Sequence, residues 1–193
     1  MKQQLTFRQY RIMDVFFFTI LLCVCESLIV LAGTRWFSGE AYTLSLTSAV
    51  TAIMLVRRGI FAAVPALAGG FVLSLVSGAG AAQMAIYCLG NMTALALVPL
   101  IRCIGWKRLH DDVLLTLLHG FATALLMQLG RVAIALALGH EPAICLGFIT
   151  TDILSTLFAM LLPWICRRLN GMLEYQPHYL KRIQEEMERN GEA

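Results

Sequence analysis

The fold is decided by residues 12–33, which read IMDVFFFTILLCVCESLIVLAG. A helix needs about 20 mostly apolar residues to cross the hydrocarbon core of a bilayer, and this run is long enough. It is also longer than the apolar region of a secretory signal sequence, so we interpret it as a first membrane-spanning helix. The rest of the chain is similar, since 59% of its 193 residues are hydrophobic and only 14% are charged. A water-soluble domain needs a more polar surface, so the sequence predicts a membrane protein.

Charged residues gather at the two ends of the chain. Residues 1–11 contain three of them and residues 167–193 contain ten, which leaves 14 for the 155 residues between. Polar, basic or glycine-rich breaks divide this apolar middle into six segments: 12–33, 42–56, 59–76, 82–104, 113–138 and 143–166. We therefore predict an all-α, polytopic membrane protein with six transmembrane helices.

Basic residues predict how these helices are oriented. If both termini are cytoplasmic, thirteen Lys and Arg side chains lie on the inner side, and Arg35 alone lies in an outer loop. Such an asymmetry follows the positive-inside rule, so we predict that the N- and C-termini are both inside. The predicted location is the cytoplasmic (inner) membrane of a bacterium, with several passes through the lipid bilayer.

The last part of the chain has a different pattern. Four apolar or aromatic residues recur every fourth position among charged ones: Tyr175, Tyr179, Ile183 and Met187. This spacing predicts an amphipathic helix on the cytoplasmic side, which lies on lipid headgroups or docks on a partner subunit. We therefore divide the chain into a transmembrane domain, residues 1–170, and a tail, residues 171–193.

Four ionisable residues fall inside the predicted spans, where a charge is costly unless it is paired or hydrated. Asp14 lies near the cytoplasmic mouth of the first span, and we interpret it as a boundary residue near Arg11. Glu26 and Arg131 lie at similar depths in the outer half, so they are candidates for an ion pair. Asp152 lies nearer to mid-depth.

Neutral polar residues are predicted in the same outer half of the bundle. Gln128 is three residues before Arg131 and therefore shares its helix face. Interhelical hydrogen bonds, each worth about 1 kcal/mol, are the usual role of a single residue of this kind. For the whole set we favour a pocket loaded from outside. In this predicted pocket Arg131 would contact an anionic or carbonyl group of the ligand, and Glu26 would either hold Arg131 or contact a cationic group. The other predicted lining residues are Gln128, Asn91, Tyr87 and Asp152.

Several kinds of chemistry find no support in the sequence. It contains no GxxxxGK[ST] loop for ATP hydrolysis, no HExxH pair and no GxSxG nucleophile, so we do not predict an enzyme. Its six cysteines have no CxxC spacing, and no metal or cofactor is predicted. The net charge of +3 is explained by topology, so nucleic-acid binding is not predicted. Ala62, Ala66 and Gly70, four residues apart, indicate only a close approach of helices.

The plan of residues 8–170 resembles the substrate-binding S components of energy-coupling factor (ECF) vitamin transporters. The likeness rests on six spans, a long first outer loop and a short second helix. It also rests on four stretches: FRQYR (7–11), RRGIFAA (57–63), IYCLGN (86–91) and FITTD (148–152).

This resemblance implies a subunit that captures a vitamin-like or other small molecule from the outer side. Its partners would be a transmembrane coupling subunit and two ATPase subunits. The family's outer loops cap the pocket, which here implies roles for 34–42, 77–82 and 139–142, with Trp36, Phe37 and Tyr42 covering a ligand. The family often has an Ala-x-x-x-Ala contact with the coupling subunit on its first helix. Thr19 and Cys23 occupy that spacing here.

Two other classes of function remain open at this point. The six-helix plan is also that of rod-shape-determining membrane scaffold proteins, in which the polar cluster would be structural and the tail helix would be the interface. An intramembrane enzyme with Glu26 or Asp152 as a base is the third class. It is disfavoured because nucleophile and metal motifs are absent.

Overall fold

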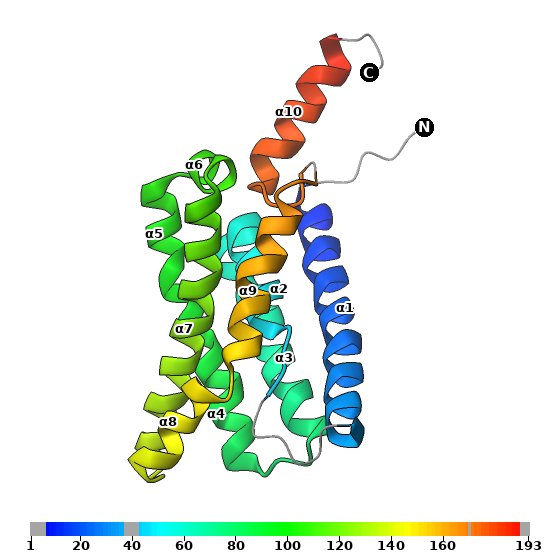
Figure 1. Ribbon diagram of the computed structural model, residues 1–193. Helices are drawn as coiled ribbons and strands as arrows, with labels where there is room; N and C mark the ends of the chain where they lie inside the picture. Colours follow the sequence, from blue (N-terminus) through cyan, green and yellow to red (C-terminus); the bar gives the residue numbers. More distant parts are fainter. Residues whose placement is uncertain (1–6, 37–42, 170, 190–193) are drawn as a thin grey trace.

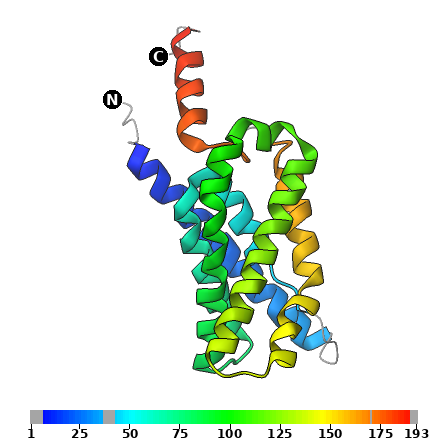
Figure 2. The ribbon, with the colours of Figure 1, turned by 90° about the vertical axis from the view of Figure 1, so that its left-hand side faces the viewer.

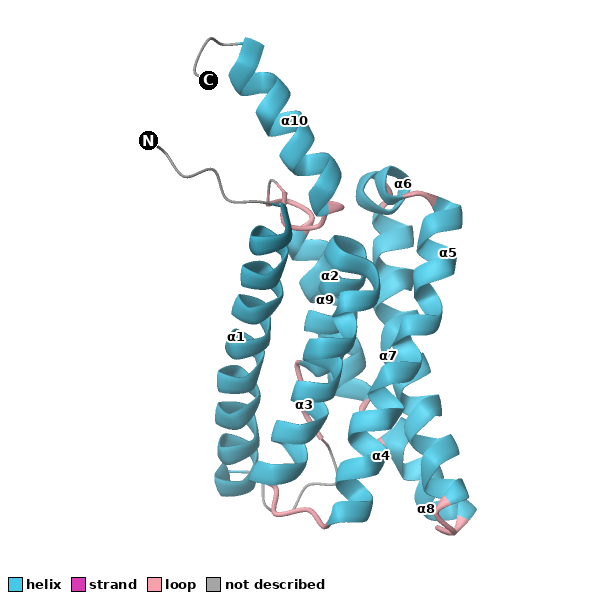
Figure 3. Ribbon diagram, turned by 180° about the vertical axis from the view of Figure 1, so that it is seen from behind, coloured by secondary structure: helices cyan, strands magenta, loops and turns pink. Residues whose placement is uncertain are grey.

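The computed structural model describes residues 7–36, 43–169 and 171–189, and all regular elements within these ranges are helices. They form one bundle from which the last helix extends (Figures 1 and 3). The α-helices are α1 (Phe7–Trp36), α2 (Thr47–Arg58), α3 (Ala63–Val76), α4 (Ala81–Met92), α5 (Leu97–Ile104), α6 (Trp106–Asp111), α7 (Val113–Ala137), α8 (Pro142–Thr150), α9 (Ile153–Cys166) and α10 (Gln176–Arg189). Two short 3₁₀-helices, η1 (Gly59–Ala62) and η2 (Thr93–Ala96), connect α2 to α3 and α4 to α5.

Five helical stretches of the described residues are long and apolar enough to cross a membrane. They are Arg8–Trp36, Thr47–Val76, Ala81–Ile104, Val113–Ala137 and Pro142–Cys166. Four of them correspond to predicted spans. The predicted second and third spans fall together in Thr47–Val76, so the all-helical membrane architecture agrees with the sequence, whereas the count of six is not confirmed.

The stretch Thr47–Val76 is bent back on itself. Gly59 has a φ of 59°, a left-handed conformation that is accessible to glycine, and it follows directly after α2. Beyond this turn α3 returns along α2, so that a Cβ on Gly69 would lie 2.6 Å from Cγ2 of Thr47. Almost every residue of α2 is buried, which makes this short helix the centre of the bundle.

The breaks in the other long stretches also have local causes. The side chain of Asp112 caps α7, because its Oδ1 accepts hydrogen bonds from the backbone N–H groups of Leu114 and Leu115 at 2.8 and 3.4 Å. Pro142 begins α8, in the first turn where a missing N–H costs nothing. Between α8 and α9 the helix is interrupted at Thr151 and Asp152, and this break brings Asp152 into the interior.

The bundle has two distinct ends (Figures 1 and 2). The described N-terminus, α6 and the link from α9 to α10 lie at one end, and α10 continues from there away from the bundle. The end of α1 and the α3–α4 and α7–α8 links lie at the other. The helix α1 packs mainly against α3 and α2 and runs obliquely in Figure 2. We call these the terminal end and the loop end.

Glycine allows α7 and α9 to touch backbone to backbone. A Cβ on Gly120 would overlap the carbonyl group of Ala159, with its carbonyl carbon at 2.7 Å and Cα of Met160 at 2.8 Å. These are backbone atoms, which cannot rotate away as a side chain can, so α7 and α9 would have to separate. The predicted small-residue stripe extends over η1 and α3. Ala62 and Ala66 are buried, and Gly70 closely approaches the backbone of Tyr87, in agreement with this prediction.

We therefore expect Gly120→Ala to lower the free energy of unfolding by about 2 kcal/mol through overpacking. The thermal midpoint of the purified protein in detergent measures this. Gly147→Ala is the matched control, because nothing lies within 4 Å of the added Cβ, and its midpoint should not fall. Equal midpoints for the two variants would contradict the tight α7–α9 contact.

Candidate functional site

A cluster of buried charged and polar side chains lies in the interior, on α1, α4, α7 and the break between α8 and α9. Arg131 on α7 is its centre. Its Nη1 donates to Oδ2 of Asp152, and its Nε donates to Oδ1 of Asn91 at 3.0 Å. The side chains of Arg131 and Asp152 are only 3% and 6% exposed. We call Glu26, Tyr87, Asn91, Gln128, Arg131 and Asp152 the polar cluster.

Asn91, Gln128 and the ring of Tyr87 make further contacts that hold the polar cluster in place. The side chain of Asn91 donates from Nδ2 to the backbone carbonyl of Ala66 at 3.1 Å, which ties α4 to α3. Gln128 donates from Nε2 to Oγ1 of Thr156 at 2.9 Å. The guanidinium of Arg131 lies over the ring of Tyr87, 4.7 Å from its centroid. The charge of Arg131 is therefore held by a carboxylate, an amide and an aromatic face.

Residues 43–46 form an irregular segment that supplies further partners. The hydroxyl of Thr43 donates to Oδ1 of Asp152, and its backbone N–H donates to the carbonyl of Thr151 at 3.1 Å. The N–H of Ser45 donates to Oγ of Ser155 at 3.0 Å. Sequence reasoning missed Thr43, Ser45 and Ser155. The abundance of Ser and Thr in the predicted second segment, residues 42–56, was the feature of the sequence that could have indicated the first two of them.

Glu26 lies apart from the ion pair. It is fully buried on the inward face of α1, and its Oε2 accepts a hydrogen bond from the N–H of Leu46 at 2.9 Å. Its Oε1 has no hydrogen-bond partner among the described residues, although the Ser45 side chain lies nearby. The predicted ion pair between Glu26 and Arg131 is wrong, because Arg131 pairs with Asp152. The charges of all three are nonetheless close enough to interact.

The structure thus brings together Tyr87, Asn91, Gln128, Arg131 and Asp152, with Glu26 beside them. Trp36 is not part of the polar cluster, since it is the last residue of α1 and 77% exposed. Phe37 and Tyr42 lie outside the described residues. Within the described ranges, no three His, Cys, Asp or Glu side chains are placed to hold a metal ion.

A second buried charged site lies at the terminal end. The carboxylate of Asp14 receives hydrogen bonds from Arg57 at 2.6 Å and from Arg58 at 2.7 Å. Arg57 also donates to the backbone carbonyls of Gly171 and Met172 at 2.6 and 2.8 Å. The prediction that Asp14 sits near Arg11 at the boundary missed these partners. The guanidinium of Arg11 instead lies over the ring of Phe61.

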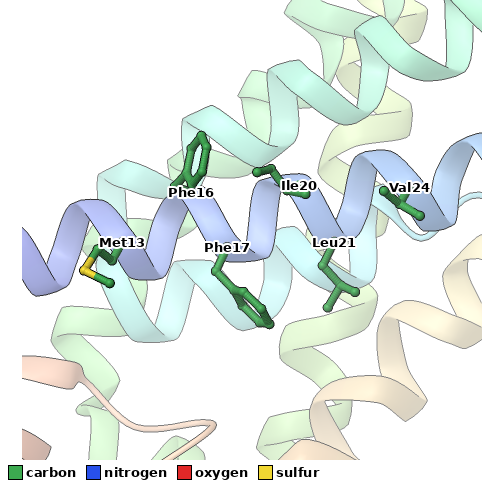
Figure 4. A pocket seen from close by; sticks show the side chains of 6 residues that line it. All are labelled: Met13, Phe16, Phe17, Ile20, Leu21 and Val24. Atoms are coloured by element: carbon green, nitrogen blue, oxygen red, sulfur yellow. The ribbon is translucent and has the colours of Figure 1, made fainter.

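The outward face of α1 is apolar. Six side chains line a shallow groove along it: Met13, Phe16, Phe17, Ile20, Leu21 and Val24 (Figure 4). Thr19 and Cys23, the predicted contacts with a coupling subunit, are half-buried on the same helix, and the hydroxyl of Thr19 donates to the carbonyl of Val15 at 2.7 Å. Such a surface suits lipid chains or another apolar helix.

Comparison with protein-family models, curated proteins and solved structures finds no match to this chain.

Proposed function

We propose that the protein is the substrate-capture (S) subunit of an ECF-type uptake transporter, and that the polar cluster is where it binds a vitamin-like or other small molecule. The observation that supports this is the polar cluster itself. The charged side chains of Glu26, Arg131 and Asp152 are buried inside the helix bundle, and Oε1 of Glu26 has no hydrogen-bond partner in the part of the chain that the structure describes. Buried polar atoms in native proteins are nearly always paired, so an exception suggests a group that a ligand completes.

The proposed topology has six spans with both termini in the cytoplasm of a bacterium. The reversal at Gly59 supports two separate passes within Thr47–Val76. Basic residues support the orientation, because Arg57 and Arg58 end α2, Arg102 lies in the last turn of α5, and Lys107 and Arg108 lie in α6. All these elements reach the terminal end, and the positive-inside rule assigns that end to the cytoplasm.

The loop end then faces outward, and substrate enters the polar cluster from there. In the proposed complex, a transmembrane coupling subunit contacts α1 at Thr19 and Cys23, and two ATPase subunits supply the energy. This chain binds and does not catalyse. Gln128 and Asn91 offer hydrogen bonds to the ligand, and the Arg131–Asp152 pair forms a rigid, polar wall.

A scaffold subunit of the rod-shape-determining type is the second candidate, and two observations favour it. Arg131 and Asp152 neutralise each other without a ligand. The helix α10 extends from the bundle, where it is free to reach a partner (Figure 1). In this alternative the polar cluster only holds the helices together.

The two candidates are distinguished by what co-purifies with the protein. We expect a capture subunit, extracted in mild detergent from its native membranes, to bring down a coupling subunit and two ATPases. Native mass spectrometry should also show a bound small molecule. Recovery of cell-wall enzymes or cytoskeletal proteins with no small molecule would favour the scaffold.

Gln128→Ala tests whether the polar cluster is the binding site. This substitution removes one hydrogen-bonding side chain, so we expect the bound fraction of the co-purified molecule to fall about 5- to 10-fold. Gln184→Ala, on the exposed side of α10, is the matched control and should retain it. Equal retention by Gln128→Ala, Asn91→Ala and wild type would show that the molecule binds elsewhere.

A further inference from the structure

The two oxygens of Glu26 are used unequally. Its Oε2 accepts the N–H of Leu46 at the start of α2, whereas Oε1 is buried and accepts no hydrogen bond from the described residues. Leu46 needs only a neutral acceptor, so a glutamine oxygen would accept this hydrogen bond equally well. The contact with Leu46 therefore does not require the negative charge of Glu26.

Arg131, the cation of the polar cluster, already has partners other than Glu26. Arg131 donates to Asp152 and Asn91, and Asp152 in turn accepts from Thr43 and Ser155. No ion pair of the described residues includes Glu26. The polar cluster thus contains two carboxylates and one guanidinium, and with both carboxylates ionised it carries one negative charge more than it can neutralise by itself.

A buried carboxylate without a counter-charge is costly in a low-dielectric interior. A proton or a bound cation can remove this cost. A cation with N–H groups supplies both missing elements at once, because it neutralises the charge and donates to Oε1. An anionic ligand would have to displace Asp152 from Arg131 and would add a second unneutralised charge.

We propose that the molecule captured at the polar cluster is a small organic cation, and that its ammonium, amidinium or protonated ring nitrogen donates to Oε1 of Glu26. This inference rests on the proposed capture function and specifies its substrate class. Glu26 is then the residue that selects for charge, while Gln128 and Asn91 contact neutral parts of the ligand.

The test uses full-length protein in lipid nanodiscs and compares wild type with Glu26→Gln. Glutamine keeps the size of the side chain and an oxygen for Leu46 but removes the charge. Two measurements are made. One is native mass spectrometry of the co-purified molecule, whose charge at pH 7 is read by ion exchange after release. The other is stabilisation by three probes of nearly equal shape: benzamidine, benzamide and benzoate, which are cationic, neutral and anionic.

We expect the co-purified molecule to be cationic and to bind Glu26→Gln about 10- to 100-fold more weakly, as loss of a charge-assisted hydrogen bond implies. Benzamidine should raise the melting temperature of wild type more than benzamide or benzoate, and Glu26→Gln should lose this preference. Glu185→Gln, exposed on α10, is the matched control and should behave as wild type. Without ligand, Glu26→Gln should melt no lower than wild type.

Different results overturn different parts of the proposal. A neutral or anionic co-purified molecule, equal retention by Glu26→Gln, or no preference of wild type for benzamidine over benzamide would refute the cation inference and leave the capture function standing. If wild type contains no small molecule and brings down no ATPase, the capture function itself is wrong, and the inference fails with it.

Discussion

Arg131→Ala should lower the free energy of unfolding by about 3–5 kcal/mol, the usual cost of removing one partner of a buried ion pair. The substitution leaves the carboxylate of Asp152, whose side chain is 6% exposed, without a cation. It also removes the donor to Asn91 and the charge over the ring of Tyr87. Equilibrium unfolding in mixed micelles, supported by thermal midpoints, measures the loss.

Two further variants separate the effect of charge from that of truncation. Arg168→Ala removes an exposed arginine that lies over Trp164 near the end of α9, and it should change stability by less than about 1 kcal/mol. The double variant Arg131→Ala with Asp152→Asn removes both charges of this ion pair but keeps an acceptor for Thr43. It should recover at least half of the loss. A double variant as unstable as Arg131→Ala would indicate that packing, rather than charge, dominates.

The sequence predicted the helices well because a bilayer imposes a strong constraint. Each spanning segment must be long and apolar, and basic residues concentrate in the loops on the cytoplasmic side. The short second segment was harder. It is buried on nearly all sides in the centre of the bundle, and length and composition alone do not distinguish a pass of its own from the first half of a longer stretch.

The members of the polar cluster were also predicted, but their pairing was not. Glu26 and Arg131 were paired because they lie at similar depths along their predicted helices. Depth alone does not show which side chains face each other. The interruption of the helix at Thr151 and Asp152 turns the carboxylate of Asp152 inward, to Arg131. Helical periodicity assumes an unbroken helix, so it does not predict a contact that depends on a break.

The same limit explains the misassigned partner of Asp14. Arg11 is one helical turn away in sequence, whereas Arg57 and Arg58 are more than forty residues away. Their positions depend on the reversal at Gly59, which returns the chain at the terminal end. Spacing along the helix favours Arg11 as the partner of Asp14, whereas the contacts with Arg57 and Arg58 depend on how α2 packs against α1.

Asp14→Ala should therefore lower the free energy of unfolding by roughly 3 kcal/mol, although Asp14 is near the end of a span. The substitution deprives two arginines of their shared counter-charge, with side chains only 7% and 4% exposed. Nε of Arg57 and Nη2 of Arg58 already have no hydrogen-bond partner among the described residues, so loss of the carboxylate leaves further buried N–H groups unpaired. The loss lies at the lower end of the usual range because Arg57 keeps the carbonyls of Gly171 and Met172.

The effect of Asp14→Ala can also be measured at the start of the tail. Arg57 holds Asp14 through one terminal nitrogen and residues 171 and 172 through the other, so removing the carboxylate should loosen the start of the tail. Hydrogen exchange in residues 171–175 should then accelerate, together with a lower thermal midpoint. Asp111→Ala, exposed at the same end, is the matched control and should change neither. If Asp14→Ala destabilised the protein without faster exchange there, Arg57 would hold the tail independently of Asp14.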